Sequence, residues 1–203
     1  MLYEFSNKAV NSIRRCLWRT LLRSSFGSTG RGTYVRKPLR LSGACYMHLG
    51  AEVNIMDLSW LLCLKIDAVK PCLSIGDRTY IGHLAHIVCV RNVSIGTDVL
   101  VADRVYVSDN THEYRDPRLP VKEQPVLFRG EAAIGNGSWV GEGVCIIGAK
   151  VGAHCVIGAN SVVTRDIPDF SVAVGSPARV VKTLDRGNGT WMSVNHTTGE
   201  ALA

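Results

Sequence analysis

An aliphatic residue recurs every six positions along most of this chain, usually followed by glycine and, four positions on, by a small residue. Ile75-Gly76 with Thr79 is one example. Six residues match neither the 3.6-residue period of a helix nor the two-residue alternation of a long strand. They match a short strand and a tight turn, repeated, and three such units make one triangular coil whose stacked copies bury a continuous core. The sequence therefore predicts an all-β coil of stacked short strands.

Each position of the repeat has its own physical task. The aliphatic side chain is predicted to point into the core, and the small residue to occupy an inner corner where a bulky side chain would collide with the next coil. We expect glycine at the turn because it tolerates backbone angles that other residues reach only with strain. The aliphatic positions of nine matches are Leu49, Ile75, Ile81, Ile95, Val101, Ile134, Val140, Val151 and Ile157.

Gaps in the repeat divide the chain. Residues 35–183 are predicted to form the coil, after a basic arm and linker at 1–34 and before a polar, flexible tail at 184–203. The register is lost over 57–72, which we expect to be an excursion packed against the coils. It is lost again over 108–131, and a long loop that leaves a compact scaffold is usually functional.

The positive charge of the chain lies in its first 40 residues. They hold nine Lys or Arg against one acidic residue, a net charge of +8. The whole chain has +6, so the remaining residues carry −2, and no basic stripe for nucleic acid is predicted on the coil. This arm can form an amphipathic helix that caps the coil or lies on an anionic membrane surface, and its Arg-rich composition also fits a transit peptide. The apolar side of that helix is formed by Phe5, Ala9, Ile13, Leu17 and Leu21.

The cysteine pattern argues against a metal site. Seven cysteines are scattered along the chain without a CxxC pair. Such spacing favours neither zinc binding nor a disulfide framework, and the odd count favours a reducing compartment. We therefore predict no metal.

The residue best suited to acid–base chemistry is His112, which lies where the coil gives way to the long loop. Histidine is the side chain whose ordinary pKa allows proton exchange near neutral pH. Beside a substrate hydroxyl it can serve as a general base. The residues alone also allow a surface histidine without a role.

The repeat and three further segments resemble the hexapeptide-repeat acyltransferases. Residues 108–120, SDNTHEYRDPRLP, are similar to the loop of sugar O-acetyltransferases that modify bacterial surface polysaccharides, and of the galactoside and maltose acetyltransferases. Residues 157–168, IGANSVVTRDIP, and 175–182, GSPARVVK, are similar to the C-terminal signature of the coenzyme-A-dependent members. The resemblance implies a left-handed parallel β-helix with a protruding loop and a short C-terminal extension.

In that family the loop histidine removes the proton from the acceptor hydroxyl, and the resemblance gives this role to His112. The galactoside enzymes also use an asparagine about two repeats upstream, where this chain has Gly82. The candidates to support His112 in its place are Asp109, His86 and His83.

The same resemblance implies a site for acetyl-CoA, the acyl donor, along the last coils. Backbone groups there suit the extended pantetheine arm, and Arg and Lys suit the phosphates. Trp139 and Tyr114 are candidates for the substrate groove, although Trp139 can also cover a packing surface. The residues implied to contact the donor are Gly141, Ala159, Thr164, Arg165, Arg179 and Lys182.

These features predict an acetyl-CoA-dependent O-acetyltransferase that acts on a sugar or glycan hydroxyl in the biosynthesis of cell-surface polysaccharide. The resemblance implies a homotrimer with the donor groove between adjacent coils. We expect a cytoplasmic protein whose basic arm can contact the inner face of the membrane. Three alternatives use the same scaffold: an N-acetyltransferase of an amino-sugar nucleotide, a metalloenzyme holding zinc with His83, His86 and His112, and a non-catalytic protein.

Overall fold

A computed structural model describes residues 12, 18, 22–194 and 201–202 of the 203-residue chain. The amphipathic helix predicted within 1–34 lies outside the described residues, apart from isolated positions. In the described part, no helix is long and apolar enough to span a membrane.

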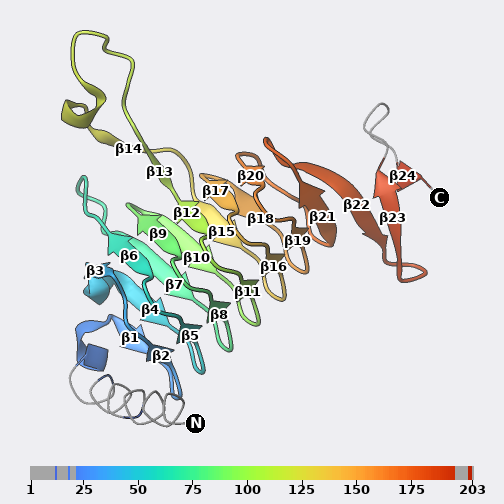
Figure 1. The fold of residues 1–203 in the computed structure, drawn as a ribbon, viewed down its shortest axis with the longest axis horizontal. Coiled ribbons are helices and arrows are strands. Elements are labelled where there is room, and N and C mark those ends of the chain that lie inside the picture. Colours follow the sequence, from blue (N-terminus) through green and yellow to red (C-terminus); the bar gives the residue numbers. More distant parts are fainter. Residues whose placement is uncertain (1–11, 13–17, 19–21, 195–200, 203) are drawn as a thin grey trace, which may run out of the picture.

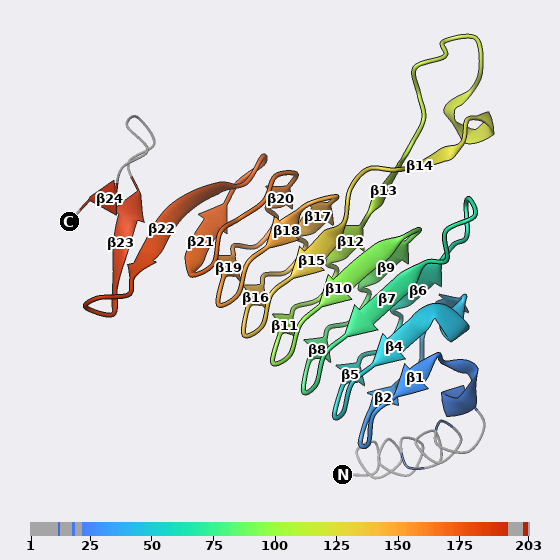
Figure 2. The ribbon, with the colours of Figure 1, turned by 180° about the vertical axis from the view of Figure 1, so that it is seen from behind.

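The described chain winds through three flat faces, here called A, B and C, so that each turn of the coil adds one strand to each face (Figures 1 and 2). Face A contains β1 (Ser28–Thr29), β4 (Met47–Leu49), β7 (Cys72–Ile75), β10 (Asn92–Ile95), β15 (Ala132–Ile134) and β18 (Lys150–Val151). Face B contains β2 (Tyr34–Val35), β5 (Asn54–Ile55), β8 (Tyr80–Ile81), β11 (Leu100–Val101), β16 (Trp139–Val140), β19 (Val156–Ile157) and β21 (Ser171–Val174). Face C contains β3 (Arg40–Ser42), β6 (Trp60–Cys63), β9 (His86–Cys89), β12 (Tyr106–Ser108), β17 (Cys145–Ile147) and β20 (Val162–Val163).

Elements outside the coil are few among the described residues. Three short 3₁₀ turns are η2 (Arg23–Ser25), η3 (Ala44–Tyr46) and η4 (Val121–Glu123). A two-stranded hairpin consists of β13 (Asn110–His112) and β14 (Val126–Phe128). Face B is extended by three antiparallel strands, β22 (Arg179–Asp185), β23 (Thr190–Val194) and β24 (Ala201–Leu202).

The hexapeptide period sets the register between coils. Ile75 pairs with Ile95, and Ile95 with Ile134, each one coil further along face A. All nine aliphatic positions of the repeat are buried, with no more than 3% of each side chain exposed. The small residues four positions later are buried as well, Thr79 and Ala85 among them. The all-β coil predicted from the period and the parallel β-helix that the resemblance implies are therefore confirmed.

The glycines of the repeat have a different role from the predicted one. Gly76 and Gly96 do not have positive φ; that conformation falls two positions later, at Arg78 (φ 55°) and Asp98 (φ 57°). A Cβ at Gly76 would instead lie 2.6 Å from the carbonyl carbon of Gly96 on the next coil. At these glycines the turns of successive coils approach so closely that a Cβ would collide with the next turn, and this contact, not backbone angle, favours glycine.

The structure corrects three predicted boundaries. The first coil begins at β1 instead of residue 35, because Ser28 already pairs with His48. The excursion is limited to residues 64–71, since β6 lies in register with β9. The repeat was hidden there because outward-facing Trp60 and Leu62 are apolar and the preceding turn lacks glycine.

The third correction concerns the C-terminal segment. The flexible tail predicted from residue 184 is wrong for residues 184–194, where β22 pairs with β23. Polar residues without a six-residue period here mark exposed antiparallel strands, not loss of structure.

Trp18 covers the start of the core. Its side chain is buried, its Nε1 donates to the carbonyl oxygen of Thr33 at 2.9 Å, and its ring packs edge-on against Phe26 and Tyr34. At this one residue of the arm, the structure shows docking against the first coil.

We predict that Gly135→Ala destabilises the protein by about 1–3 kcal/mol, because its new methyl group would lie 2.5 Å from the backbone nitrogen of Ala153. Urea unfolding measures the loss. The matched control is Gly187→Ala, whose only close neighbour is the Asp185 side chain. Equal stability of the two variants would contradict the inter-coil contact as the reason for glycine.

Candidate functional site

A long hairpin leaves the coil directly after β12. β13 and β14 pair antiparallel, with His112 opposite Val126, and carry a loop that projects well away from the stack (Figures 1 and 2). The loop is braced internally by Gln124, which is buried and donates to the carbonyl oxygens of Asp116 and Leu119, both at 2.9 Å. The protruding loop predicted over 108–131 is therefore confirmed, and its base is a regular β-ladder.

The carboxylate of Asp109 ties this hairpin to the preceding coil. Asp109 is fully buried and accepts hydrogen bonds from the backbone N–H groups of Val90, Arg91 and Asn92, at 2.7–2.8 Å. It also accepts from the Asn110 side chain at 3.2 Å. With its oxygens engaged in this way, Asp109 holds the base of the hairpin against the preceding coil.

Arg91 joins the hairpin to the shorter excursion at residues 64–71. Its guanidinium donates to Asp67 at 2.6 Å and lies 4.8 Å from the ring centre of Phe128. The hydrogen bond from Arg91 lowers the pKa of Asp67. One side chain thus connects the two segments that leave this corner of the coil.

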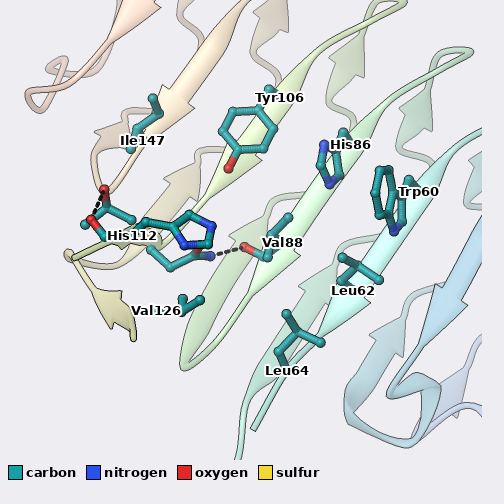
Figure 3. Close-up of a pocket in the computed structure, with 11 residues that line it drawn as sticks. Trp60, Leu62, Leu64, His86, Val88, Tyr106, His112, Val126 and Ile147 are labelled. Atoms are coloured by element: carbon teal, nitrogen blue, oxygen red, sulfur yellow. Dashed lines mark hydrogen bonds between the residues drawn. The ribbon is translucent and has the colours of Figure 1, made fainter. Parts of the chain in front are cut away.

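A pocket of about 410 Å³ lies between the hairpin and the outer surface of face C. Figure 3 shows the imidazole of His112 turned into it from β13. Aliphatic side chains form much of the wall: Leu62, Leu64, Val88, Val126 and Ile147. The remaining lining residues are Trp60, His86, Tyr106, Asn110, Thr111 and His112.

Three aromatic rings form a row on the floor of this pocket. Trp60, His86 and Tyr106 occupy equivalent outward positions on β6, β9 and β12. The Trp60 and His86 rings are stacked, with centroids 4.4 Å apart, and the Tyr106 ring lies 5.1 Å from that of His86. Burial lowers the pKa of His86, so its neutral form is favoured. Sequence reasoning named His86 but missed Trp60 and Tyr106, which would have followed from the register had it been traced through residues 57–72.

Other predicted site residues lie elsewhere. His83 is in the turn between β8 and β9, where its Nδ1 is 3.3 Å from Asp103, and it does not line the pocket. Tyr114 and Trp139 are 70% and 51% exposed and also lie outside the pocket lining. Within the described ranges, no group of three or more His, Cys, Asp or Glu side chains is placed to hold a metal ion.

Four of the six residues predicted to bind the acyl donor are on the later coils, and two follow them on β22. Gly141 and Ala159 lie in successive turns between faces B and C, and the Cβ that Gly141 lacks would be 2.7 Å from the nitrogen of Ala159. Thr164 and Arg165 follow β20, at the corner where the hairpin leaves two coils earlier. The other two are on β22, and none of the six lines the pocket that contains His112.

Comparisons with known proteins agree with this architecture. No protein-family model matches the chain. A Mycobacterium tuberculosis protein assigned as an acetyltransferase is 38% identical over 67% of this chain, which spans only 44% of that relative's length. An Escherichia coli protein assigned as a lipopolysaccharide biosynthesis O-acetyl transferase is 29% identical over 72% of this chain and 80% of its own. The galactoside O-acetyltransferase of Escherichia coli is 26% identical over 91% of this chain and 76% of its own.

Solved structures share the fold. A hexapeptide-repeat-containing acetyltransferase from Vibrio cholerae superposes with a TM-score of 0.62 at 24% identity, covering 83% of this chain and 80% of the other. An N-acyltransferase from Bacillus cereus, solved with dTDP and coenzyme A, has a TM-score of 0.69 at 18% identity, covering 84% and 90%. The chain thus has the β-helix fold of the hexapeptide-repeat proteins. Relatives that it matches are named acetyltransferases, and the predicted resemblance to the hexapeptide-repeat acetyltransferases is confirmed.

We predict that Asp109→Asn costs about 2–4 kcal/mol of stability, because either orientation of the amide turns an NH₂ group toward backbone N–H donors. Thermal unfolding measures the change. Asp103→Asn is the matched control, since its half-exposed carboxylate accepts a single backbone N–H, from His83. A cost no larger than that of the control would show that Asp109 does not anchor the hairpin.

Proposed function

We propose that this chain transfers an acetyl group from acetyl-CoA to a sugar hydroxyl, in the biosynthesis of cell-surface polysaccharide. The observation that carries the proposal is the imidazole of His112, turned from a protruding hairpin into a largely apolar pocket. The volume of that pocket lies within the range of small-molecule sites. The two Escherichia coli relatives named as O-acetyltransferases, which the chain matches over most of their length, support the choice of a hydroxyl acceptor.

In the proposed reaction His112 removes the proton from the acceptor hydroxyl as the oxygen attacks the thioester carbonyl. The C–O bond forms, the C–S bond of the tetrahedral intermediate breaks, and the imidazolium returns the proton to the departing thiolate. A backbone N–H at a coil turn can stabilise the intermediate's oxyanion, a contribution of about 3 kcal/mol in other acyl transfers. Both substrates bind together, so no covalent enzyme intermediate is needed.

The proposed donor groove runs along the later coils, past Gly141 and Ala159. The exposed cations Arg165, Arg179 and Lys182 are suited to the phosphates of coenzyme A. A second Vibrio cholerae structure of the hexapeptide-repeat acetyltransferase, 26% identical over 67% of this chain, was solved with acetyl-CoA, which supports this choice of donor. Since these residues do not line the pocket of His112 in the same chain, we place the site between subunits of a homotrimer.

The acceptor class has one competitor. An amino-sugar nucleotide could bind the same scaffold together with a coenzyme A donor, since a Bacillus cereus N-acyltransferase of this fold was solved with dTDP-4-amino-4,6-dideoxyglucose and coenzyme A. A cytoplasmic location, with the basic arm against the inner membrane face, would bring the enzyme to a lipid-linked glycan; the arm's charge is the basis for this part of the proposal.

The test is a screen for thiol release from acetyl-CoA. Neutral glycosides, nucleotide-linked sugars and amino-sugar nucleotides are compared at equal concentration, with mass spectrometry locating the acetyl group. Ester formation on a neutral sugar supports the proposal. Amide formation alone would replace it with the N-acetyltransferase, and the absence of thiol release with every acceptor would leave the proposed reaction without support.

We predict that His112→Ala lowers kcat at least about a hundredfold, because the acceptor hydroxyl loses its base, while the Kd for acetyl-CoA changes little. Stopped-assay kinetics and calorimetry give the two values. His48→Ala, which removes an exposed histidine on face A, serves as the control. Full turnover without the His112 imidazole would rule out its role.

A subunit-mixing experiment addresses the trimer. His112→Ala and the double variant Arg179→Ala/Lys182→Ala are each expected to be inactive or strongly impaired. If each site uses His112 of one subunit and the cations of the next, trimers of randomly mixed co-expressed chains should have about a quarter of the wild-type activity. A site is intact only when the first subunit retains His112 and the second retains Arg179 and Lys182. No recovery beyond the sum of the separate variants would exclude a site shared between subunits.

A further inference from the structure

Two polar atoms in the aromatic row of face C lack a partner. Within the described part of the chain, Trp60 Nε1 and His86 Nε2 are buried and neither makes a hydrogen bond. Both side chains line the pocket into which His112 is turned. Because buried polar groups are almost always hydrogen-bonded, two such atoms in one pocket wall indicate a ligand that completes them.

The stacking of the two rings holds these atoms close together. The Trp60 and His86 planes lie within 10° of parallel, with centroids 4.4 Å apart. In Figure 3 the indole nitrogen of Trp60 and one of the two imidazole nitrogens of His86 lie on the same side of the row. The cation of Arg40, 5.8 Å from the Trp60 ring centre, lies against this stack. The pair is therefore a preformed unit and not two independent side chains.

The hydrogen-bonding capacities of the two atoms select one kind of partner when the proton of the neutral His86 imidazole is on Nδ1. An indole N–H can only donate, and Nε2 of that tautomer can only accept. A hydroxyl group can accept from the first and donate to the second. With that tautomer of His86, a carboxylate or phosphate, which can only accept, and an ammonium group, which can only donate, each leave one of the two atoms without a partner.

We propose that Trp60 and His86 bind a second hydroxyl of the acceptor, one that is not acetylated. The inference rests on the proposed function for the first hydroxyl, which reacts at His112. Aliphatic side chains such as Leu62, Val126 and Ile147 make up much of the remaining wall and disfavour ionic groups. The acceptor is thus an uncharged sugar ring, held at two of its hydroxyls, and its charged or lipid-linked portion lies outside the pocket.

Trp60→Phe tests this assignment, since phenylalanine keeps an aromatic ring on His86 and removes the N–H. With the acceptor of highest turnover in the glycan screen, KM for the acceptor should rise about tenfold, while kcat and the KM for acetyl-CoA stay within about twofold. Monodeoxy forms of that acceptor, each lacking one hydroxyl, are then compared. For one of them kcat/KM should be about tenfold lower than for the parent sugar with the wild-type enzyme, and equal to that of the parent sugar with Trp60→Phe. Trp191→Phe, an exposed tryptophan on β23, is the control. An unchanged acceptor KM, or equal losses with every deoxy form, would overturn the assignment.

A binding measurement separates this assignment from the reaction itself. The indole N–H resonance of Trp60, identified by its loss in Trp60→Phe, is followed in ¹⁵N-labelled wild-type protein. Methyl glycosides of galactose, glucose, mannose and fucose are added in turn, with sodium acetate and ethylammonium chloride as charged probes. A shift with at least one glycoside and with neither ion is expected. No shift with any glycoside overturns the hydroxyl subsite even if acetyl transfer occurs, whereas a shift without transfer retains the subsite and removes the proposed reaction.

Discussion

The close contact between the turns of successive coils is the constraint on which the rest of this molecule depends. A Cβ at Gly96 would lie 2.8 Å from the nitrogen of Asn136 on the next coil, and the same crowding recurs at the other repeat glycines. At this spacing each strand hydrogen-bonds to its counterpart one coil away, as β10 does with β7 and β15. The flat faces, the continuous aliphatic core and the outward rows of side chains all follow from that spacing.

The coil could be predicted from the sequence because its period is a direct record of this contact. Positions such as Ile81 and Ala85 repeat at fixed spacing since each has an identical environment one coil later. Prediction failed where a coil has the regular strand register but lacks the residues typical of the repeat. β6 has the regular register, yet outward Trp60 and Leu62 conceal it behind an apolar run. The sequence did not predict the C-terminal strands β22 and β23 either, because exposed antiparallel strands do not have the six-residue repeat of the coil.

The candidate site was predictable in part. His112 could be found because it stands where the period breaks, and a break in a strict repeat is visible without any structure. The pocket around it could not, because its floor comes from three coils whose members lie 20 or more residues apart and meet only through register. The hydrogen bonds of Asp109 are a second feature that the sequence could not predict. Its carboxylate was considered as chemical support, but three backbone N–H groups from the previous coil engage it fully, a pairing that depends on the stacking of two corners.

The reversal of chain direction at β22 bears on the size of the molecule. A parallel coil is open-ended: the last strand on each face displays backbone groups onto which a further coil, from the same chain or from another molecule, could be added. On face B this edge is instead covered by a strand running the opposite way, paired along Ser171–Val174. A further parallel coil would need a free strand edge on all three faces, and the edge of face B is already paired with β22. At this end of the coil the antiparallel segment thus covers the edge of face B against further parallel stacking, and at the other end the indole of Trp18 covers the first coil.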